Sequence, residues 1–486
     1  MNLIQPILNH GKTRPHAPAL IDGDREIRYG ELAGLVLRTA SYLAGLGIVP
    51  GDRVGLCLKD GWEHVVALLA VARMGAVIVP LNWRAARTET SELAMALSVK
   101  LALVERESAP ALDCAVVPMD ARWHRSVAEC EPLSTLPDDW HAALDIAATS
   151  GSTGAPKFSL ATHLHNYCGA AGWIELMAIS GRHRYLSTLP LHFAGGRRAV
   201  YLHLLRGDCV LLYGSLVNGP DFIEAAARLS ATVAIVVPSL VRDLLAAAGD
   251  EPLLPDLAIL MSGGARLFAE EKRAALRKLS PNFCEGYGTS ETNTISLLRS
   301  VDMDSHPDSV GQPHSLAEVQ VVDEDDRPLP IGQSGKLRLR GPSLASPLAA
   351  LGQPIHPGFR AGWYYPGEIA ALDDHGYIYL TGRTSELIIR HGAKIPPAEV
   401  EAVLQQHPDV LECAVIGHRA ANNEEEVIAF LVGRRPLDLA AIIAHCRTYL
   451  APAKRPQRIH FVPALPKNAS GKIDKMALAK QLADSG

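Results

Sequence analysis

From Glu31 to Glu285, two kinds of segment alternate along the chain. In one kind the apolar residues recur at helical spacing, and in the other they form short continuous runs. The first helical set follows Glu31 and ends before Gly45; it comprises Leu32, Leu35, Val36, Ala40 and Leu43. Residues three or four apart share one face of a helix, so this spacing predicts an amphipathic helix that packs on a core. The short runs between such sets predict buried strands.

The alternation continues with a regular order of strands and helices. Further helices are predicted at residues 63–74, 166–177, 199–205, 221–229, 240–248 and 268–279. Strands are predicted at residues 54–58, 76–79, 145–148, 158–162, 185–188, 209–212, 233–237, 258–261 and 282–285. Repeated strand–helix units predict parallel sheets covered by helices on both faces, with ligands bound beyond the carboxyl ends of the strands.

The pattern changes after Asp304. Short strands at 316–322, 335–339 and 376–380, separated by turn-rich segments, predict a smaller β-rich subdomain. A last α+β unit starts near Glu386, with strands at 387–390, 411–416, 427–432 and 459–462 and helices at 398–406 and 439–450. We therefore predict an α/β fold: a large N-terminal domain of two doubly wound parallel-sheet subdomains plus a β-rich subdomain, followed by a small, mobile α+β C-terminal domain.

Length and composition are those of a multi-part globular protein. The chain has 486 residues, 48% hydrophobic and 20% charged, so several subdomains are expected. The net charge of −5 and the absence of a Lys/Arg run argue against nucleic-acid binding. Eight scattered cysteines lack zinc-ligand or disulfide-framework spacing, which favours a reducing cytoplasm.

Neither a signal peptide nor a membrane span is expected. Residues 1–10 lack a basic region followed by a long apolar run. The most apolar window, residues 65–81, contains Arg73 and Gly75 and stops at Pro80, so it predicts a buried helix and strand.

The segment from Thr149 to Lys157 has the composition of a loop that can wrap phosphates. Glycines allow backbone N–H groups to approach an anion, hydroxyls add donors and the lysine adds a charge. The loop is not a Walker loop, because Pro156 precedes the lysine and a strand rather than a helix is predicted after it. Its candidate contact residues are Thr149, Ser150, Gly151, Ser152, Thr153, Gly154 and Lys157.

Two further segments follow predicted strands. At Gly286-Tyr287-Gly288-Thr289-Ser290-Glu291, an aromatic ring can stack on a base, hydroxyls can reach phosphate, and a carboxylate can hold Mg²⁺. The second segment, Ser262-Gly263-Gly264-Ala265, lets backbone approach a flat ligand. Near the C-terminus, residues 465–474 form a Pro/Gly loop in which Lys472 can neutralise developing charge.

Several motifs resemble, in order, those of the adenylate-forming superfamily of acyl-CoA synthetases, adenylation domains and firefly luciferase. Residues 149–157 resemble T-S-G-T-T-G-x-P-K, and residues 287–291 resemble Y-G-x-T-E. Residues 362–368 resemble G-W-x-x-T-G-D. Gly382 and Arg383, with Gly392, Ile395, Pro397, Glu399 and Glu401, match G-R-x-K-D…G-x-x-I-x-P-x-E-x-E, and residues 466–472 resemble P-K-x-x-x-G-K. The resemblance extends from about His10 to Ala479.

The resemblance implies two half-reactions. A carboxylate attacks the α-phosphate of Mg·ATP to give an acyl-adenylate and pyrophosphate, and a thiol then takes the acyl group. It also implies a domain of residues 1–383, a hinge at 384–386 with Ser385 at its centre, and a C-terminal domain of residues 387–486 that rotates between the two reactions.

The resemblance also implies a role for each matched residue. Thr149, Ser150, Thr153 and Lys157 would contact phosphates, Tyr287 would stack on adenine and Glu291 would bind Mg²⁺. Ser290 would assist at the α-phosphate, Glu368 and Arg383 would hold the ribose, and Lys472 would stabilise the transition state of adenylation. Gly263, Gly264, Ala265, Gly286, Gly288 and Thr289 complete the expected nucleotide site.

Four positions depart from the family pattern. Glu368 is one methylene longer than the usual Asp, and Ser385 replaces the usual Lys or Asp of the hinge. Phe158 replaces a small residue after the loop lysine, where it would either narrow a channel or pack in the core, and Pro366 replaces Thr.

The acyl pocket in relatives is lined from the segments that correspond here to residues 189–196, 237–239 and 262–265. Candidate lining residues are His192, Phe193, Gly195 and Ser262. No carboxylate is placed there to hold an amino group, which favours an apolar or aromatic acid over an amino acid. Arg197 and Arg198 would either meet a second carboxylate or, for at least one of them, lie on the outer face of the following helix.

We therefore predict a cytoplasmic, AMP- and pyrophosphate-forming acid–CoA ligase that uses ATP, Mg²⁺ and coenzyme A. Its partners would be a small carboxylic acid and CoA, with no nucleic acid and no membrane span; a homodimer is left open. The alternatives are a stand-alone adenylation enzyme that loads a carrier-protein phosphopantetheine, and a nucleotide-binding homologue that has lost catalysis.

Overall fold

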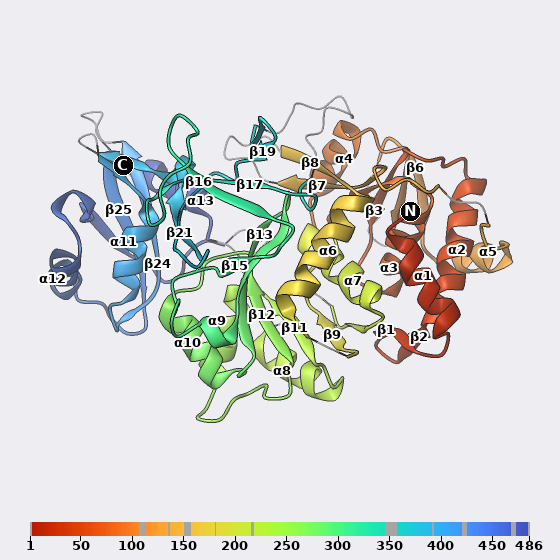
Figure 1. The fold of residues 1–486 in the computed structure, drawn as a ribbon, viewed down its shortest axis with the longest axis horizontal. Helices are drawn as coiled ribbons and strands as arrows, with labels where there is room; N and C mark the ends of the chain where they lie inside the picture. Colours follow the sequence, from red (N-terminus) through yellow and green to blue (C-terminus); the bar gives the residue numbers. More distant parts are fainter. Residues whose placement is uncertain are drawn as a thin grey trace.

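The computed structural model describes residues 2–105, 112–134, 137–149, 157–179, 181–214, 218–345, 357–390, 393–419, 425–467 and 473–484. The N-terminal elements lie at one end of the molecule and the C-terminal elements at the other (Figure 1). No helix in these ranges is long and apolar enough to span a bilayer.

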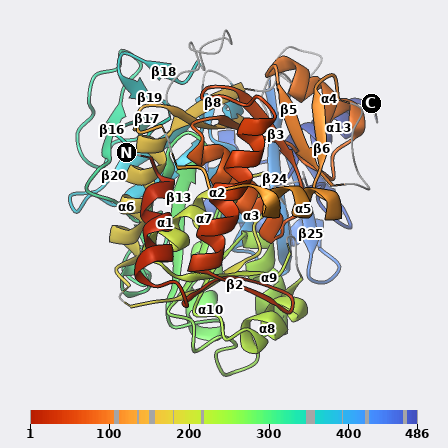
Figure 2. The ribbon, with the colours of Figure 1, turned by 90° about the vertical axis from the view of Figure 1, so that its right-hand side faces the viewer.

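The first sheet has six strands in the order β6-β5-β3-β4-β7-β8. Five of them run parallel: β6 (Ala115–Pro118), β5 (Leu101–Val104), β3 (Arg53–Cys57), β4 (Val77–Pro80) and β7 (Ala143–Thr149). The edge strand β8 (Lys157–Thr162) pairs antiparallel with β7. The surrounding helices are α1 (Ile4–Thr13), α2 (Tyr29–Gly45), α3 (Trp62–Arg73), α4 (Arg87–Ala96) and α5 (Ala121–Glu129); α1 and α2 face the viewer in Figure 2.

The second sheet has nine strands in the order β15-β14-β13-β12-β11-β9-β10-β1-β2. Its parallel part comprises β13 (Phe283–Thr289), β12 (Ile259–Gly263), β11 (Val233–Val236), β9 (Arg184–Ser187), β10 (Cys209–Leu212) and β1 (Pro18–Asp22). Antiparallel strands close both edges: β14 (Asn293–Leu298), β15 (Gln312–Pro313) and β2 (Arg25–Arg28). Its helices are α6 (His163–Met177), α7 (Ala194–Arg206), α8 (Gly219–Arg228), α9 (Pro238–Ala247) and α10 (Ala269–Lys278).

A β-rich sheet and a small α+β unit complete the chain. The β-rich sheet comprises β16 (Glu318–Val322), β17 (Gly335–Arg340), β18 (Phe359–Arg360), β19 (Trp363–Tyr364), β20 (Glu368–Leu372) and β21 (Ile378–Arg383). After the short helix η3 (Thr384–Glu386) come β22 (Ile388–Arg390), β23 (Ala393–Ile395), β24 (Val410–Arg419), β25 (Glu425–Gly433) and β26 (Arg458–Phe461). The helices of this unit are α11 (Pro397–Gln405), α12 (Leu439–Tyr449) and α13 (Lys475–Asp484).

The predicted fold class is confirmed, with two corrections. The expectation of purely parallel sheets is wrong at the edges, where β2, β8, β14 and β15 run antiparallel. The helix predicted from residue 199 begins at Ala194 and includes two glycines. At Gly196 a Cβ atom would lie 2.3 Å from the Pro190 carbonyl oxygen, so only glycine allows this close approach.

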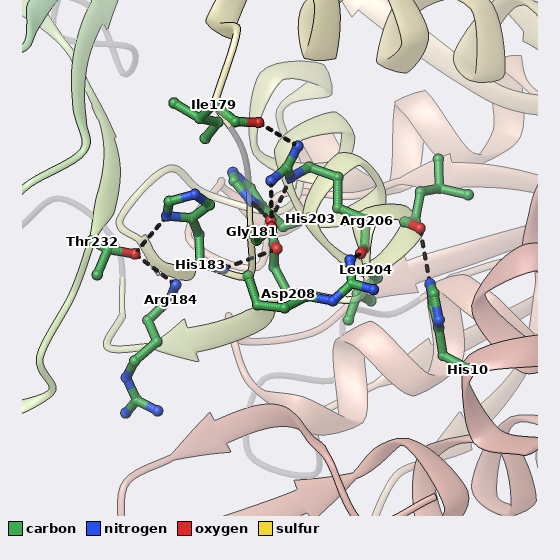
Figure 3. A network of polar contacts seen from close by, with 12 residues as sticks. His10, Ile179, Gly181, His183, Arg184, His203, Leu204, Arg206, Asp208 and Thr232 are labelled. Carbon is green, nitrogen blue, oxygen red and sulfur yellow. Dashed lines mark hydrogen bonds and ion pairs between the residues drawn. The ribbon is translucent and has the colours of Figure 1, made fainter. Parts of the chain in front are cut away.

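Asp208 organises a buried polar network between α7 and β10 (Figure 3). Its Oδ2 accepts hydrogen bonds from His203 Nδ1 at 2.8 Å and from Arg206 Nε at 2.9 Å, and its Oδ1 accepts one from the His183 N–H at 3.0 Å. The backbone oxygen of Asp208 accepts from Tyr29 Oη at 2.6 Å, which joins α2 to this network.

The charge state of this network follows from burial and hydrogen bonding. Burial lowers the pKa of His203, and its Nε2 is buried without a partner among the described residues, so the ring is neutral. Burial alone would raise the pKa of Asp208, but the donors from His203, His183 and Arg206 together hold it below its ordinary value. Asp208 is therefore a carboxylate at neutral pH.

Replacing Asp208 by Asn should destabilise the protein at pH 7 by roughly 3 kcal/mol, because Arg206 then loses its buried carboxylate. The folded pKa of Asp208 lies below the unfolded value, so this stabilisation is present above the unfolded pKa and is lost as pH falls through the folded pKa.

Denaturant unfolding followed by tryptophan fluorescence at several pH values measures this difference. The exposed Asp374→Asn variant is the control and should differ from wild type by less than about 0.5 kcal/mol. A difference between wild type and Asp208→Asn that is constant between neutral and strongly acidic pH would contradict the assignment.

Candidate active site

The predicted phosphate loop leaves and re-enters the first sheet at one point. Thr149 at the end of β7 pairs directly with Lys157 at the start of β8, so these strands form the two sides of a hairpin. The expected contact residues Ser150, Gly151, Ser152, Thr153 and Gly154 lie outside the described residues. Phe158, near the start of β8, packs against the hydrophobic cluster of the first sheet. Of the two alternatives for this residue, packing in the core is therefore the one observed.

The motif from Gly286 to Thr289 lies on a strand rather than after one. β13 was expected to end at Glu285, but it continues through Thr289 because β14 pairs with it antiparallel. Gly288 lies at a bulge in this hairpin, and a Cβ atom there would be 1.8 Å from the Asn293 carbonyl oxygen. Ser262 and Gly263 likewise lie on β12, beside Glu285 and Gly286, whereas Gly264 and Ala265 follow it and are exposed.

Glu291 is a buried carboxylate held by the turn that follows β13. Its side chain is 4% exposed, and its Oε2 accepts a hydrogen bond of 2.7 Å from Thr289 Oγ1. The Thr289 hydroxyl also accepts from the Glu291 N–H at 3.2 Å, which fixes the turn. Burial and the Glu291 carboxylate raise the pKa of Tyr364, whose hydroxyl interacts with Thr289 and Glu291. Ser290, which lies between Thr289 and Glu291 in sequence, is half-buried.

Glu368 and Arg383 face each other across β20 and β21. They are directly paired in the register of the two strands, and Arg383 Nε and Nη2 donate to Glu368 Oε1 at 2.9 and 2.8 Å. Burial alone would lower the pKa of Arg383, but the Glu368 carboxylate raises it above the ordinary value. The longer Glu therefore still meets the arginine expected beside it.

Tyr287 joins these groups into one site. Its ring is 9% exposed and packs in a cluster with Leu337, Leu339 and Tyr364 of the β-rich sheet. Burial raises the pKa of Tyr287 strongly, and the charges of Glu368, Arg383 and Glu291 all act on its hydroxyl. Three segments that are far apart in sequence thus meet around one aromatic side chain.

The predicted acyl-pocket residues lie at the start of α7 and the end of β12. His192 and Phe193 precede the helix with tilted rings whose centroids are 4.3 Å apart, and burial lowers the pKa of His192 to about 4, so this ring is neutral at pH 7. A Cβ atom at Gly195 would meet nothing within 4 Å. Ser262 is fully buried, and its Oγ has no hydrogen-bond partner in the described part of the chain.

Neither arginine of α7 lies on an outer helix face, which overturns that alternative. Arg197 is fully buried; its Nε and Nη2 donate to Asp145 Oδ2 at 3.2 Å, and its Nη1 donates to the Leu191 and His192 carbonyls. Arg198 is 6% exposed. Sequence reasoning missed Asp145 and Tyr364 as site residues, although an acidic residue inside an apolar strand was a visible signal.

The residues predicted to form the hinge are described, whereas the lysine predicted to be catalytic is not. Ser385 is exposed in the middle of η3. Lys472 and Gly392 lie outside the described residues, while Lys467 and Ile473 on either side of that loop form an antiparallel bridge. Lys475 bridges the hinge and α11, with its Nζ 2.7 Å from Glu386 Oε2 and 2.9 Å from Glu401 Oε1.

Among the described residues, the buried Glu291 is the residue predicted to bind Mg²⁺. Within the described ranges, no three His, Cys, Asp or Glu side chains form a metal-binding cluster. Mg²⁺ often binds through one or two carboxylates and the phosphates of a substrate, and the buried Glu291 fits that mode.

The chain belongs to the AMP-binding enzyme family. The profile of AMP-binding enzymes matches residues 8–347, and the profile of the AMP-binding enzyme C-terminal domain matches residues 399–472. The resemblance expected from the motifs is therefore confirmed.

Named relatives match nearly the whole chain. A 2-succinylbenzoate–CoA ligase of Bacillus licheniformis is 29% identical, and the match covers 94% of this chain and 96% of that protein. A feruloyl-CoA synthase of an Amycolatopsis species is also 29% identical, with 96% of each covered. The crystal structure of ATP-bound MatB from Rhodopseudomonas palustris superposes with a TM-score of 0.90 at 25% identity, covering 100% of both chains.

Replacing Gly288 by Ala should destabilise the hairpin that carries Thr289 and Glu291 by more than about 2 kcal/mol, because the new Cβ would overlap the Asn293 carbonyl. Thermal unfolding measures this loss. Gly34→Ala on α2 is the matched control: its Cβ would meet nothing within 4 Å, and Ala favours a helix by about 1 kcal/mol. Equal melting temperatures for the two variants would refute the close approach.

Proposed function

We propose that the protein is an acid–CoA ligase that activates a carboxylic acid with ATP. A carboxylate oxygen attacks the α-phosphorus, the bond to the bridging oxygen of pyrophosphate breaks, and an acyl-adenylate forms. The sulfur of CoA then attacks the acyl carbon, the thiol proton is lost and AMP leaves. Family membership and the two acyl-CoA-forming relatives support both half-reactions.

The observation that carries the proposal is the meeting of Glu291, Glu368 and Arg383 around Tyr287. In the proposed complex Tyr287 lies against adenine, Glu368 accepts the ribose hydroxyls, and Arg383 holds Glu368 in place. Ser290 assists at the α-phosphate. The loop of residues 149–157 wraps the β- and γ-phosphates from the end of β7.

In this proposal Glu291 would be the protein ligand of Mg²⁺, and the ion would supply charge neutralisation of the phosphates, which favours attack at phosphorus. The contribution of the chain itself is to fix the carboxylate: the Thr289 hydroxyl bonds one oxygen of Glu291, which limits the orientations of the side chain.

The two half-reactions require different positions of the C-terminal domain. Residues 1–383 form the large domain, 384–386 the hinge around Ser385, and 387–486 the small domain that carries Lys472. Polar contacts cross this proposed division: Arg266 Nη1 donates to the Ala398 carbonyl at 3.3 Å, and Lys394 Nζ lies 2.6 Å from Glu324 Oε1. Such contacts can break and re-form with little loss of burial.

Pyrophosphate exchange with a panel of carboxylic acids tests the proposal. At least one acid should support exchange, and adding CoA should convert that acid to its thioester with release of AMP. Absence of exchange with every acid would sink the enzyme assignment. Exchange that proceeds normally while free CoA is not acylated would favour carrier-protein loading instead.

Lys472→Ala should depress adenylation by about 100-fold or more, because the lysine offsets charge that develops in the first transition state only. Thiolation of a supplied acyl-adenylate should change by less than about fivefold. Single-turnover measurements of each step separate the two effects, and Lys480→Ala on α13 serves as the control. Equal loss in both steps would contradict the domain rotation.

A further inference from the structure

Arg198 is a buried guanidinium that forms no ion pair with another described residue. It is 6% exposed, and its Nε is buried without a hydrogen-bond partner among the described residues. No ion pair joins Arg198 to a carboxylate in that part of the chain, and the loop of residues 150–156 contains no acidic residue. A buried charge without a partner costs several kcal/mol, so its retention calls for an explanation.

Asp145, the carboxylate with the largest charge effect on Arg198, pairs with the neighbouring Arg197 through one oxygen, while its Oδ1 is buried without a hydrogen-bond partner among the described residues. Asp145 Oδ2 accepts hydrogen bonds from Arg197 Nε and Nη2. Arg197 Nη1 donates to two backbone carbonyls instead. Asp145 and Glu291 act on Arg198 through their charges, and no hydrogen bond joins either carboxylate to Arg198 in the described part of the chain. Asp145 therefore forms its ion pair with Arg197 alone, and Arg198 has no ion pair of its own among the described residues.

Other groups around Arg198 do not cancel this charge. His165 of α6 is neutral at pH 7, because burial and the positive charge of Arg198 lower its pKa to about 4. Tyr201, one turn further along α7, keeps its proton, since burial raises its pKa. Glu291 is committed to Thr289 and, in the proposed function, to magnesium.

Arg198 also lies beside open space on its own helix. Gly195 is three residues earlier on α7, so the two positions are neighbours on the helix surface. Gly195 is exposed and a Cβ atom there would meet nothing within 4 Å, so the surface next to Arg198 can accept a ligand. This is the segment expected to line the acyl pocket.

We infer that Arg198 binds a second carboxylate of the acid substrate, so that the enzyme activates dicarboxylic acids. The inference rests on the proposed function and refines it: one carboxylate of the acid is adenylated, and the other receives paired N–H···O bonds from the guanidinium. The expected apolar or aromatic body of the acid lies between these two ends.

Paired substrates test this inference most sharply. Succinate, glutarate, adipate and phthalate are each compared with the corresponding half-amide, which keeps the reacting carboxylate and replaces the other by a neutral group of the same shape. At least one diacid should exceed its half-amide in kcat/KM for pyrophosphate exchange by about 100-fold.

In Arg198→Gln the preference for the diacid over its half-amide in kcat/KM should fall below about fivefold, because kcat/KM falls for the diacid and not for the half-amide. Arg198→Lys should restore part of this preference. Wild type that uses half-amides as well as diacids would overturn the inference. Equal loss on both members of a pair would also overturn it, since the guanidinium would then contact the reacting carboxylate or a phosphate.

A binding measurement tests the carboxylate site at Arg198 without requiring catalysis. The affinity of the same diacids is measured by calorimetry in the presence of α,β-methylene-ATP. If no acid supports exchange, the ligase assignment fails, but a diacid that binds wild type about 100-fold more tightly than Arg198→Gln still supports a carboxylate site at Arg198. Failure of every diacid to bind wild type would overturn it.

Thermal unfolding of two neighbouring variants excludes a merely structural role. Arg197→Met breaks the buried pair with Asp145 and should lower the melting temperature by several degrees. Arg198→Met removes an unpaired buried charge and should leave the melting temperature unchanged or raise it. A fall for Arg198→Met as large as that for Arg197→Met would show that Arg198 stabilises the fold and would overturn the inference.

Discussion

The buried ion pair between Arg197 and Asp145 connects the two parts of the molecule on which the site depends. Both side chains are fully buried, and the guanidinium also bonds the carbonyls of Leu191 and His192. Asp145 lies on β7, the strand that ends at the predicted phosphate loop, and Arg197 lies on α7, the helix at the segment predicted to line the acyl pocket. Because removing either partner would leave a buried charge, the strand and the helix keep one relative position.

A second constraint acts on the nucleotide side. Tyr287 packs into the core of the β-rich sheet, and the charges of Glu368, Arg383 and Glu291 act on its hydroxyl. The strand pairing of β13 with β14 and of β20 with β21 fixes the backbone that carries these three charged residues. Family membership, a shared fold and this geometry together support one reaction class.

The sequence predicted the alternation of strands and helices well, because buried strands and amphipathic helices leave clear periodic signals. It failed where tertiary contacts decide. β13 extends beyond Glu285 because β14 pairs with it, and α7 starts at Ala194 with Gly196 packed against the Pro190 carbonyl, where a larger residue would not fit. The motif residues were found by resemblance, whereas the burial of Arg198 could not be, because helical spacing alone does not show how many layers cover a helix. The burial of α7 on almost every residue shows that it lies between layers.

Oxygen transfer tests the central claim most directly, since it reports which bond the carboxylate forms. An acid of the active panel, labelled with ¹⁸O in its carboxylate, is incubated with ATP, CoA and the wild-type enzyme, and the products are analysed by mass spectrometry. Attack on the α-phosphorus predicts that one labelled oxygen appears in AMP and none in pyrophosphate. Label in inorganic phosphate with release of ADP would mean that the acid attacks the terminal phosphate, and would contradict the account.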